Sequence, residues 1–366
     1  MGCGGIGGIL GAALAQQDCG LVAVTHNEAI AAAINAHGFE VVTGGQRQRV
    51  PGRAHVAIPA DAGQFDFVFL AMQPPQVEEA ARAALPFLAP AGAMVCFQNG
   101  LCEARVAPIV GPQRTLGAIV AWGGSMLRPG VYERTSGGGF VLGSFERHPD
   151  NEARLPALAG VLQAVGPTRT SDNLRGSRWS KLAINCAISS LGTIGGDRLG
   201  ALMRYRYARR LGLELMTETV AVARACDIVL EKVSGTIDLE WVALTPADLV
   251  GPGSPSLLAK HALLLAVGAK FRRLRSSMLA AIERGREPAV EYLNGEVLAR
   301  GLRLGVPTPI NARVRALIHA LARGECRPSH ALLHKLYRDS RADVGPTRRR
   351  PPLGGAGIAI EAAPPG

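Results

Sequence analysis

The sequence predicts an α/β domain with a parallel sheet, followed by a second domain made only of helices. Three patterns in the 366 residues predict this division. Up to residue 171, short apolar runs alternate with helical patterns, which is typical of a parallel sheet covered on both faces. A glycine-rich stretch precedes the first helical pattern, and from residue 172 long segments follow the 3.6-residue period of amphipathic helices. We therefore expect domains at residues 1–171 and 172–330.

In the first domain, each apolar run predicts a strand and each helical pattern predicts a connecting helix. Gly38 stands where a glycine commonly ends a helix. The alternating, glycine-rich stretch at residues 131–143 predicts an antiparallel hairpin that closes the domain. The expected strands are residues 21–24, 67–71 and 93–97, and the expected helices are residues 6–16, 28–37 and 76–88.

The second domain is expected to consist of long helices whose apolar faces could form either an internal core or the contact of a homodimer. From residue 338 to 366, proline, glycine and arginine dominate without an apolar period, so we expect a disordered tail. The expected helices are residues 179–191, 208–227, 256–271, 276–285, 289–305 and 311–324.

The composition excludes several classes of protein. The longest apolar candidate, residues 257–271, is interrupted by Lys260, His261 and Lys270, so we expect no membrane span. The net charge of +11 comes from scattered arginine runs without interleaved aromatic residues, which argues against nucleic-acid binding. The seven cysteines show neither Cys-x-x-Cys nor zinc-ligand spacing. We therefore expect no metal site, and reduced cysteines in a cytoplasmic protein.

The pattern G-x-G-x-x-G at Gly2, Gly4 and Gly7 precedes the first expected helix. Gly2 would make a tight turn, Gly4 would let the backbone approach a pyrophosphate, and Gly7 would let helix and strand pack closely. The helix N-terminus adds free N–H groups and the positive end of its dipole. Together these features predict a Rossmann-type dinucleotide site.

A strand of four to six apolar residues normally precedes such a loop, whereas this sequence starts at Met1. That strand is central in a doubly wound sheet, and its loss would leave the neighbouring strands without ladder partners. We therefore expect that the first strand is truncated here and that the native start lies upstream of Met1.

The turn Thr25-His26-Asn27 bears on the choice of cofactor. NAD sites usually place Asp or Glu at this point to hold the ribose 2′-hydroxyl, while NADP sites need room and donor groups. No acid ends the strand at residues 21–24, although Glu28 follows shortly. The pattern favours NADP, and an ordinary polar turn is the alternative.

Lys181 and Asn185 stand four residues apart in an otherwise apolar helical pattern, so they share one helix face. An unpaired buried ammonium is costly. Lys181 is therefore either a domain-interface residue with its ammonium in water, or an acid in a cleft with a tunable pKa. Only five of the 40 basic residues are lysines, which favours the second interpretation, because arginine serves wherever a fixed charge suffices.

Asn99 follows the expected strand at residues 93–97, and ligands bind beyond the carboxyl ends of parallel strands. Asn99 could therefore contact a cofactor or a substrate. The alternative is an ordinary Asn-Gly turn with Gly100.

Several short stretches of the sequence occur in the same order as in the members of one known family. They are Gly2-Cys3-Gly4-Gly5-Ile6-Gly7-Gly8, Gln98-Asn99-Gly100-Leu101, the glycine-rich residues 134–143, Trp179-Ser180-Lys181-Leu182-Ala183-Ile184-Asn185, Ser276-Ser277-Met278-Leu279, Asn294-Gly295 and Gly305-Val306-Pro307-Thr308-Pro309. Together they resemble the ketopantoate reductase (2-dehydropantoate 2-reductase) family. The resemblance implies a Rossmann domain, an all-α domain of the 6-phosphogluconate-dehydrogenase-like type, and a cleft between them. It also implies a cytoplasmic enzyme of pantothenate biosynthesis that reduces a small 2-oxo acid with NADPH.

By this resemblance Lys181 would be the general acid, which protonates the forming alkoxide and polarises the carbonyl. Asn99 would lie near the nicotinamide and the substrate. The residues that would bind the substrate are Asn99, Asn185, Ser189 and Ser277, with Ser277 near a helix start. The residues that would bind the cofactor are Gly2, Cys3, Gly4, Gly5, Ile6, Gly7, His26, Gln73 and Asn99.

The departures from the family pattern concern the hold on substrate and cofactor. The family's acidic residue, which helps to hold the substrate hydroxyl and the lysine, falls on Ala289. Glu287 and Glu291 lie two positions away, about 200° round a helix, so neither replaces it simply. An amide of the family falls on Leu274. Three more family positions, an amide, an arginine and a lysine, fall on Ser189, His26 and Gln73.

Missing hydrogen-bond partners for a substrate hydroxyl typically remove several kcal/mol of selectivity. The sequence therefore leaves two alternatives beside 2-dehydropantoate reduction. The chain could reduce a different small carbonyl substrate that lacks the distal hydroxyl, or it could be a non-catalytic NADP-binding sensor.

Overall fold

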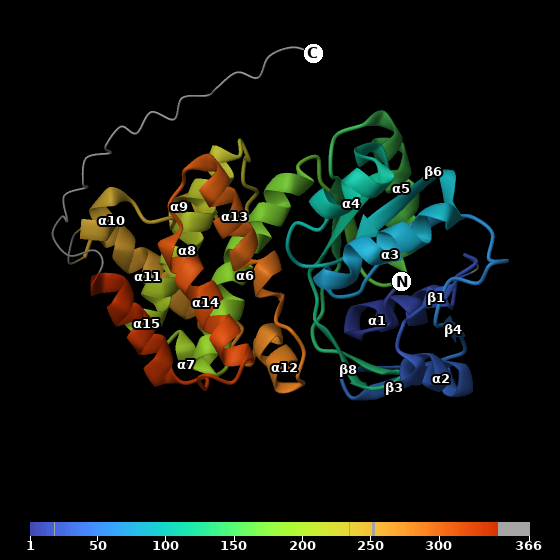
Figure 1. The fold of residues 1–366 in the computed structure, drawn as a ribbon, viewed down its shortest axis with the longest axis horizontal. Coiled ribbons are helices and arrows are strands. Elements are labelled where there is room, and N and C mark those ends of the chain that lie inside the picture. The colour runs from blue at the N-terminus through green and yellow to red at the C-terminus, as the bar shows by residue number, and fades with distance from the viewer. Residues whose placement is uncertain (18, 234, 251–252, 343–366) are drawn as a thin grey trace, which may run out of the picture.

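The computed structural model describes residues 1–17, 19–233, 235–250 and 253–342. An N-terminal α/β part and a C-terminal helical part lie side by side, with the long helix α6 (Leu174–Gly195) where they meet (Figure 1). In the part of the chain that the structure describes, no helix is long and apolar enough to span a membrane.

The main sheet has the strand order β11-β10-β7-β6-β5. Along β6, Ala93 and Val95 pack into one core, while Met94 and Cys96 pack into the other. Because both faces are buried, the strand is continuously apolar. The parallel strands are β5 (Phe65–Leu70), β6 (Leu88–Cys96) and β7 (Thr115–Val120); β10 (Phe140–Ser144) runs antiparallel to β7 and parallel to β11 (Thr168–Thr170).

Two smaller sheets complete the α/β part. One pairs β1 (Ala23–Val24) with β4 (Ala54–His55) in parallel. Residues 1 and 2 join this pair to the main sheet, because the Gly2 N–H donates to the Val24 carbonyl at 2.7 Å and the Ala71 N–H donates to the Met1 carbonyl at 2.9 Å. The other sheet has the order β3 (Gln46–Val50), β2 (Phe39–Thr43), β9 (Val131–Arg134) and β8 (Gly124–Arg128).

The predicted hairpin at residues 131–143 is wrong. β9 pairs antiparallel with β8 and parallel with β2, whereas β10 belongs to the main sheet. The glycines before β10 lie close to the segments next to its neighbours in the main sheet, since a Cβ on Gly138 or Gly139 would overlap the backbone of Ala121 or Pro167. Gly138 also has φ of 139°, which only glycine adopts readily.

The helices of the α/β part agree in number with the sequence pattern up to α3, and the expected helix at residues 28–37 is found with those bounds. The helix expected at 76–88 is shorter, because Pro86 lies in a 3-10 turn that ends it. The elements are α1 (Gly5–Leu14), α2 (Glu28–His37), η1 (Pro74–Gln76), α3 (Val77–Ala84), η2 (Leu85–Phe87), α4 (Glu103–Val110), η3 (Pro112–Arg114) and α5 (Pro149–Gln163).

In the helical part, α6 packs against α8 and both contribute to one continuous core. The sequence pattern missed the short helices and α15. The helices after α6 are α7 (Leu199–Leu202), α8 (Arg206–Ala225), α9 (Leu239–Val242), α10 (Pro246–Val250), α11 (Pro255–Lys270), α12 (Ser277–Glu283), η4 (Ala289–Tyr292), α13 (Asn294–Leu304), α14 (Pro309–Ala322) and α15 (His330–Ala342).

Two expectations for this part need correction. The helix expected at residues 289–305 breaks at Leu293, because the buried Asn294 side chain is held by Ser190 at 2.7 Å and by Asn311 at 2.9 Å. Residues 338–342, assigned to the disordered tail, belong to α15, whose Leu333 side chain is fully buried in the core. The rest of that tail lies outside the described residues.

Candidate active site

The glycine loop at residues 2–8 forms a cradle in which Gly4 alone of its glycines has open space around it. A Cβ on Gly2 would lie 2.6 Å from the Met72 nitrogen, and a Cβ on Gly7 would overlap the Gly2 carbonyl. A Cβ on Gly5 would meet the Gly124 carbonyl at 2.5 Å. A Cβ on Gly4, in contrast, would have nothing within 4 Å. The open space over Gly4 therefore fits the close approach of a pyrophosphate, as the motif predicts.

The N-terminus of α1 supports the same assignment. Helix α1 begins at Gly5 with Gly4 as its N-cap, and no side chain caps the first N–H groups, including that of Ile6. The buried Tyr132 hydroxyl donates to the Cys3 carbonyl at 3.0 Å and holds the loop from the second sheet. Burial raises the pKa of the Cys3 thiol, so this side chain stays uncharged at neutral pH. Unpaired N–H groups and the helix dipole make this end of α1 suitable for an anion.

His26 and Gln73, the residues expected on the cofactor side, are both exposed. His26 follows β1, and its neighbour Asn27 caps α2 by accepting a hydrogen bond from the Ile30 N–H at 3.1 Å. Gln73 stands at the N-cap of η1, one residue after Met72, which contacts Gly2. Both residues thus follow backbone that contacts Gly2, Val24 for His26 and Met72 for Gln73.

Helix α6 brings the predicted catalytic residue to the sheet. The Lys181 side chain is partly buried, and its ammonium donates to the carbonyl of Val120, the last residue of β7, at 2.8 Å. Burial and the neighbouring Arg178 cation lower the pKa of Lys181 to about 7, and the Glu103 carboxylate opposes them. No carboxylate forms an ion pair with Lys181 among those found in the described residues. Lys181 is therefore an ammonium that can lose its proton near neutral pH.

A second lysine, the fully buried Lys260, shows what a structural ammonium looks like in this chain. It forms an ion pair with Asp248 at 2.6 Å and also donates to the Ala243 carbonyl. The contrast with Lys181 favours the interpretation of Lys181 as an acid whose pKa is tuned by burial.

Asn185 and Ser189 lie on the same face of α6 as Lys181, about one and two helical turns toward the C-terminus. The Asn185 side-chain nitrogen is buried and has no hydrogen-bond partner among the residues that the structure describes, so it is available to a bound ligand. The Ser189 carbonyl accepts from Thr193 and from Ser276, both at 2.8 Å. Ser276 is the N-cap of α12, and the exposed Ser277 begins that helix. The predicted substrate residues from α6 and α12 are thus brought together.

Asn99 is exposed at the end of β6, where ligands bind in parallel sheets. Its neighbours are fixed on both sides: the Gln98 side chain donates to the Leu70 carbonyl at 3.0 Å, and Gly100 has φ of 94°. A Cβ on Gly100 would lie 2.5 Å from the Tyr292 carbonyl of η4. The loop that contains Asn99 is therefore packed against the helical part, on the element that begins at Ala289.

Sequence reasoning missed a buried ion pair between Arg178 and Glu103, which lies beside Lys181. Arg178 precedes Lys181 by three residues, so helical spacing could have indicated that it shares the same face. Nothing in the sequence pointed to Glu103 on α4 as its partner.

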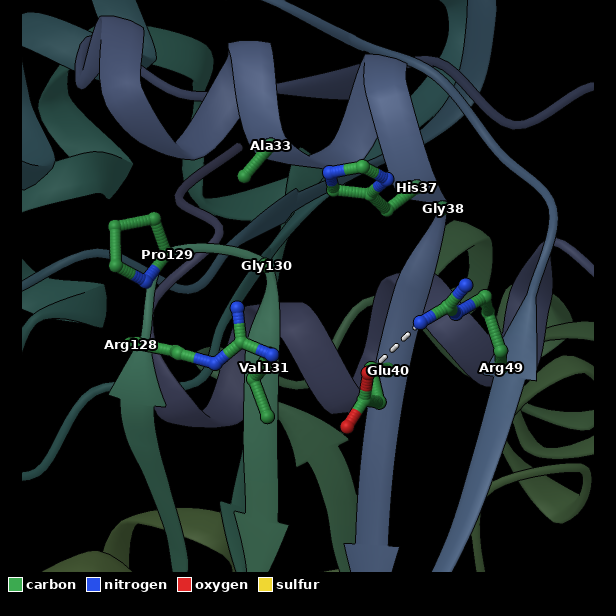
Figure 2. Close-up of a pocket in the computed structure, with 9 residues that line it drawn as sticks. All are labelled: Ala33, His37, Gly38, Glu40, Arg49, Arg128, Pro129, Gly130 and Val131. Atoms are coloured by element: carbon green, nitrogen blue, oxygen red, sulfur yellow. Dashed lines mark hydrogen bonds and ion pairs between the residues drawn. The ribbon is translucent and has the colours of Figure 1, made fainter.

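A pocket elsewhere in the α/β part contains none of these residues. Figure 2 shows that it lies at the C-terminal end of α2, where Glu40 and Arg49 form an ion pair at 3.4 Å. His26 precedes the opposite end of that helix. Among the described residues, no group of three or more His, Cys, Asp or Glu side chains could hold a metal ion.

Comparison with protein families identifies the chain. The model described as "Ketopantoate reductase PanE/ApbA" matches residues 1–147, and the one described as "Ketopantoate reductase PanE/ApbA C terminal" matches residues 173–322. The chain belongs to the ketopantoate reductase family. Its α/β part and its helical part are the two parts that this family's models describe, which confirms the expected fold class.

Known members of the family match along nearly their whole length. The 2-dehydropantoate 2-reductase of Mesorhizobium japonicum is 25% identical over 345 residues, which cover 88% of this chain and 96% of that protein. The one from Pyrococcus horikoshii is 23% identical and covers 87% of this chain and 95% of its own length.

Solved structures of the same fold match equally far. A PanE/ApbA family ketopantoate reductase from Ralstonia eutropha JMP134 has a TM-score of 0.71 at 25% identity, over 88% of this chain and 97% of that one. D-mandelate dehydrogenase, solved with NADH and anilino(oxo)acetate, has a TM-score of 0.75 at 20% identity, with the same coverage. At 20% identity the second likeness concerns the fold alone.

The cradle makes a direct prediction about cofactor binding. Gly4→Ala places a methyl group in the open space over the loop without touching the protein. We expect the Kd for NADPH, measured by fluorescence titration, to rise by roughly tenfold, equivalent to about 1.4 kcal/mol. The free energy of unfolding should change by less than about 0.5 kcal/mol. Gly160→Ala, also with nothing within 4 Å but on α5, is the matched control. Equal affinities for the three proteins would contradict the site.

Proposed function

We propose that the protein reduces a small 2-oxo acid to the 2-hydroxy acid with NADPH, as 2-dehydropantoate 2-reductases do for 2-dehydropantoate. Membership of a reductase family makes the chain an oxidoreductase. The observation that supports the proposal best is Lys181, an ammonium with its pKa lowered to about 7 that reaches the carboxyl end of β7. The seven unpaired cysteines suit a reducing compartment such as the cytoplasm.

Two contacts near the end of β7 support placing the cofactor and substrate sites close together. Gly5 of the glycine loop packs on Gly124, four residues after Val120 in the chain. Val120 in turn accepts the hydrogen bond from Lys181. The face of α6 then continues through Asn185 toward α12. The glycine loop thus packs on the segment that follows β7, and the end of β7 holds Lys181, which shares a face of α6 with Asn185.

The chemistry needs a hydride and a proton. Bound NADPH would supply the hydride to the carbonyl carbon. Lys181 holds the proton on Nζ and gives it to the oxygen, which would otherwise become an alkoxide. Before transfer, the positive charge of Lys181 stabilises the negative charge that develops on that oxygen. Asn185 provides a buried N–H donor to orient the acceptor, and the Val120 carbonyl holds the ammonium in place.

The choice of NADPH rests on the turn after β1. Thr25, His26 and Asn27 place no carboxylate where NAD sites hold the ribose 2′-hydroxyl. Glu28 is the first residue of α2, where a carboxylate already interacts favourably with the helix dipole. The exposed His26 and Gln73 leave room and hydrogen-bonding groups for a 2′-phosphate.

The part of the site expected to bind the 2-oxo acid has fewer polar side chains than the family pattern has there. Ala289 and Leu274 stand where the family has an acid and an amide. Glu291 does not take over, because its carboxylate is bound to Arg315 at 2.7 Å and to His319 at 2.5 Å. This favours a 2-oxo acid without a distal hydroxyl over 2-dehydropantoate.

Lys181→Met tests the proposed acid. The variant should still bind NADPH, while kcat for 2-oxo acid reduction falls by about 10³ because no other group protonates the oxygen. Initial rates of NADPH oxidation and a fluorescence titration of the cofactor measure the two effects. Lys232→Met, at an exposed lysine, is the control and should match the unchanged protein. A protein that binds NADPH but reduces no member of a 2-oxo acid panel would instead be a sensor.

Ala289→Glu tests the assignment of the substrate. A carboxylate at this position would accept a hydrogen bond from the distal hydroxyl of 2-dehydropantoate. We expect kcat/KM for 2-dehydropantoate to rise roughly 10- to 100-fold relative to 2-oxoisovalerate, the worth of one hydrogen bond to a charged group. Ala299→Glu, on the exposed surface of α13, is the control. No relative gain would show that residue 289 does not face the acceptor.

A further inference from the structure

The buried Arg178–Glu103 pair joins the two parts of the molecule beside the candidate active site. Arg178 belongs to α6 and Glu103 to α4, and each side chain is only 3% exposed. Arg178 precedes Lys181 by three residues on the same helix, so the two side chains share a helix face. A buried pair of this kind is costly to desolvate, so it needs further contacts to be stable.

Those contacts go to the ends of two strands. The Arg178 guanidinium donates to the Gln98 carbonyl at 2.8 Å and to the Cys96 carbonyl at 2.7 Å. It also donates to the Ala118 carbonyl at 3.4 Å. Cys96 is the last residue of β6, and Gln98 immediately precedes Asn99. Ala118 lies two residues before the residue of β7 that accepts the hydrogen bond from the catalytic ammonium.

We propose that Arg178, oriented by Glu103, is a positioning residue that fixes Lys181 and Asn99 relative to each other. The planar guanidinium reaches three carbonyls and one carboxylate at once, which the single ammonium of a lysine cannot do. It therefore holds α6 against β6 and β7 near Asn99, which follows β6, and Val120, which ends β7. This role rests on the proposed function, because it concerns the reduction that Lys181 performs.

The charges of the pair act on the same lysine. The Arg178 cation lowers the pKa of Lys181 and the Glu103 carboxylate raises it; of the charged side chains described, these two act on it. The remaining neighbour from β7, the Val120 carbonyl, is uncharged. Burial raises the pKa of Glu103, and the Arg178 cation opposes that rise. Removing the carboxylate alone leaves a cation beside Lys181 and should make its ammonium more acidic.

Another buried pair shows what a purely structural role would look like. Arg210 and Glu214 lie one turn apart on α8, each 9% exposed, and Arg210 also donates to the Asp248 carbonyl at 2.8 Å. These hydrogen bonds of Arg210 stay within the helical part. Glu214→Gln is therefore a matched control for Glu103→Gln.

The first experiment measures the ionisation of Lys181 without relying on turnover. The pH dependence of its reaction with fluorodinitrobenzene, followed by peptide mass spectrometry, gives the pKa of its amine. In Glu103→Gln we expect this value to fall by roughly half to one unit. In Glu214→Gln it should stay unchanged. An unchanged value in Glu103→Gln would overturn the proposal.

The second experiment separates geometry from charge. Arg178→Lys keeps the positive charge but loses the planar guanidinium with its several N–H donors. We therefore expect kcat to fall roughly 10- to 100-fold, while the KM for NADPH changes less than about twofold. Thermal melting checks that this conservative variant is folded. A kcat equal to that of the unchanged protein would overturn the positioning role. If the unchanged protein reduces no 2-oxo acid, the proposed function fails, and the labelling result then decides the Arg178–Glu103 coupling alone.

Discussion

The arrangement depends on one costly contact: an ammonium is partly withdrawn from water and placed against a backbone carbonyl, with no carboxylate paired to it in the described part of the chain. Lys181 meets Val120 in this way, and its pKa of about 7 is the consequence. Lys260 is buried still more deeply in the same chain but has Asp248 beside it. The difference between these two lysines distinguishes an ammonium that holds the fold together from one that can give up its proton.

The fold supports this contact from both sides. The end of β7 is fixed by the continuous apolar sheet, while α6 is fixed in the core of the helical part. The glycine loop packs on the segment that follows β7, because Gly5 lies directly on Gly124, where a side chain would not fit. Tyr132 then holds the loop from the second sheet through the Cys3 carbonyl. Gly5 therefore lets the glycine loop lie close to the segment after β7, while Lys181 contacts the end of the same strand.

Local patterns in the sequence were sufficient for much of this. The run at residues 93–97 predicted a strand because both of its faces are buried, and Gly38 marked the end of α2. The spacing of Lys181 and Asn185 indicated their shared face. All of these signals lie within a few residues of the structure that they predict.

Features that depend on distant pairing could not be obtained in this way. β9 and β10 alternate like a hairpin, but their partners, β2 and β7, lie far away in the chain, so the two strands enter different sheets. Glu103 is separated from Arg178 by 75 positions, and neither spacing nor composition connects them. The sequence alone showed that Ala289 replaces the acid of the family pattern. That Glu291 is bound by Arg315 and His319 depends on how α14 packs, which the sequence did not reveal.

The pH dependence of kcat/KM for 2-oxo acid reduction tests the central claim most directly. If Lys181 is the proton donor, the reaction needs its protonated form, and its pKa of about 7 sets the upper limit of the active range. The account predicts a constant kcat/KM below pH about 7 and a decrease approaching tenfold per unit above it. A value that stays constant to pH about 9 would contradict it, because the donor would then be an ordinary lysine or another group.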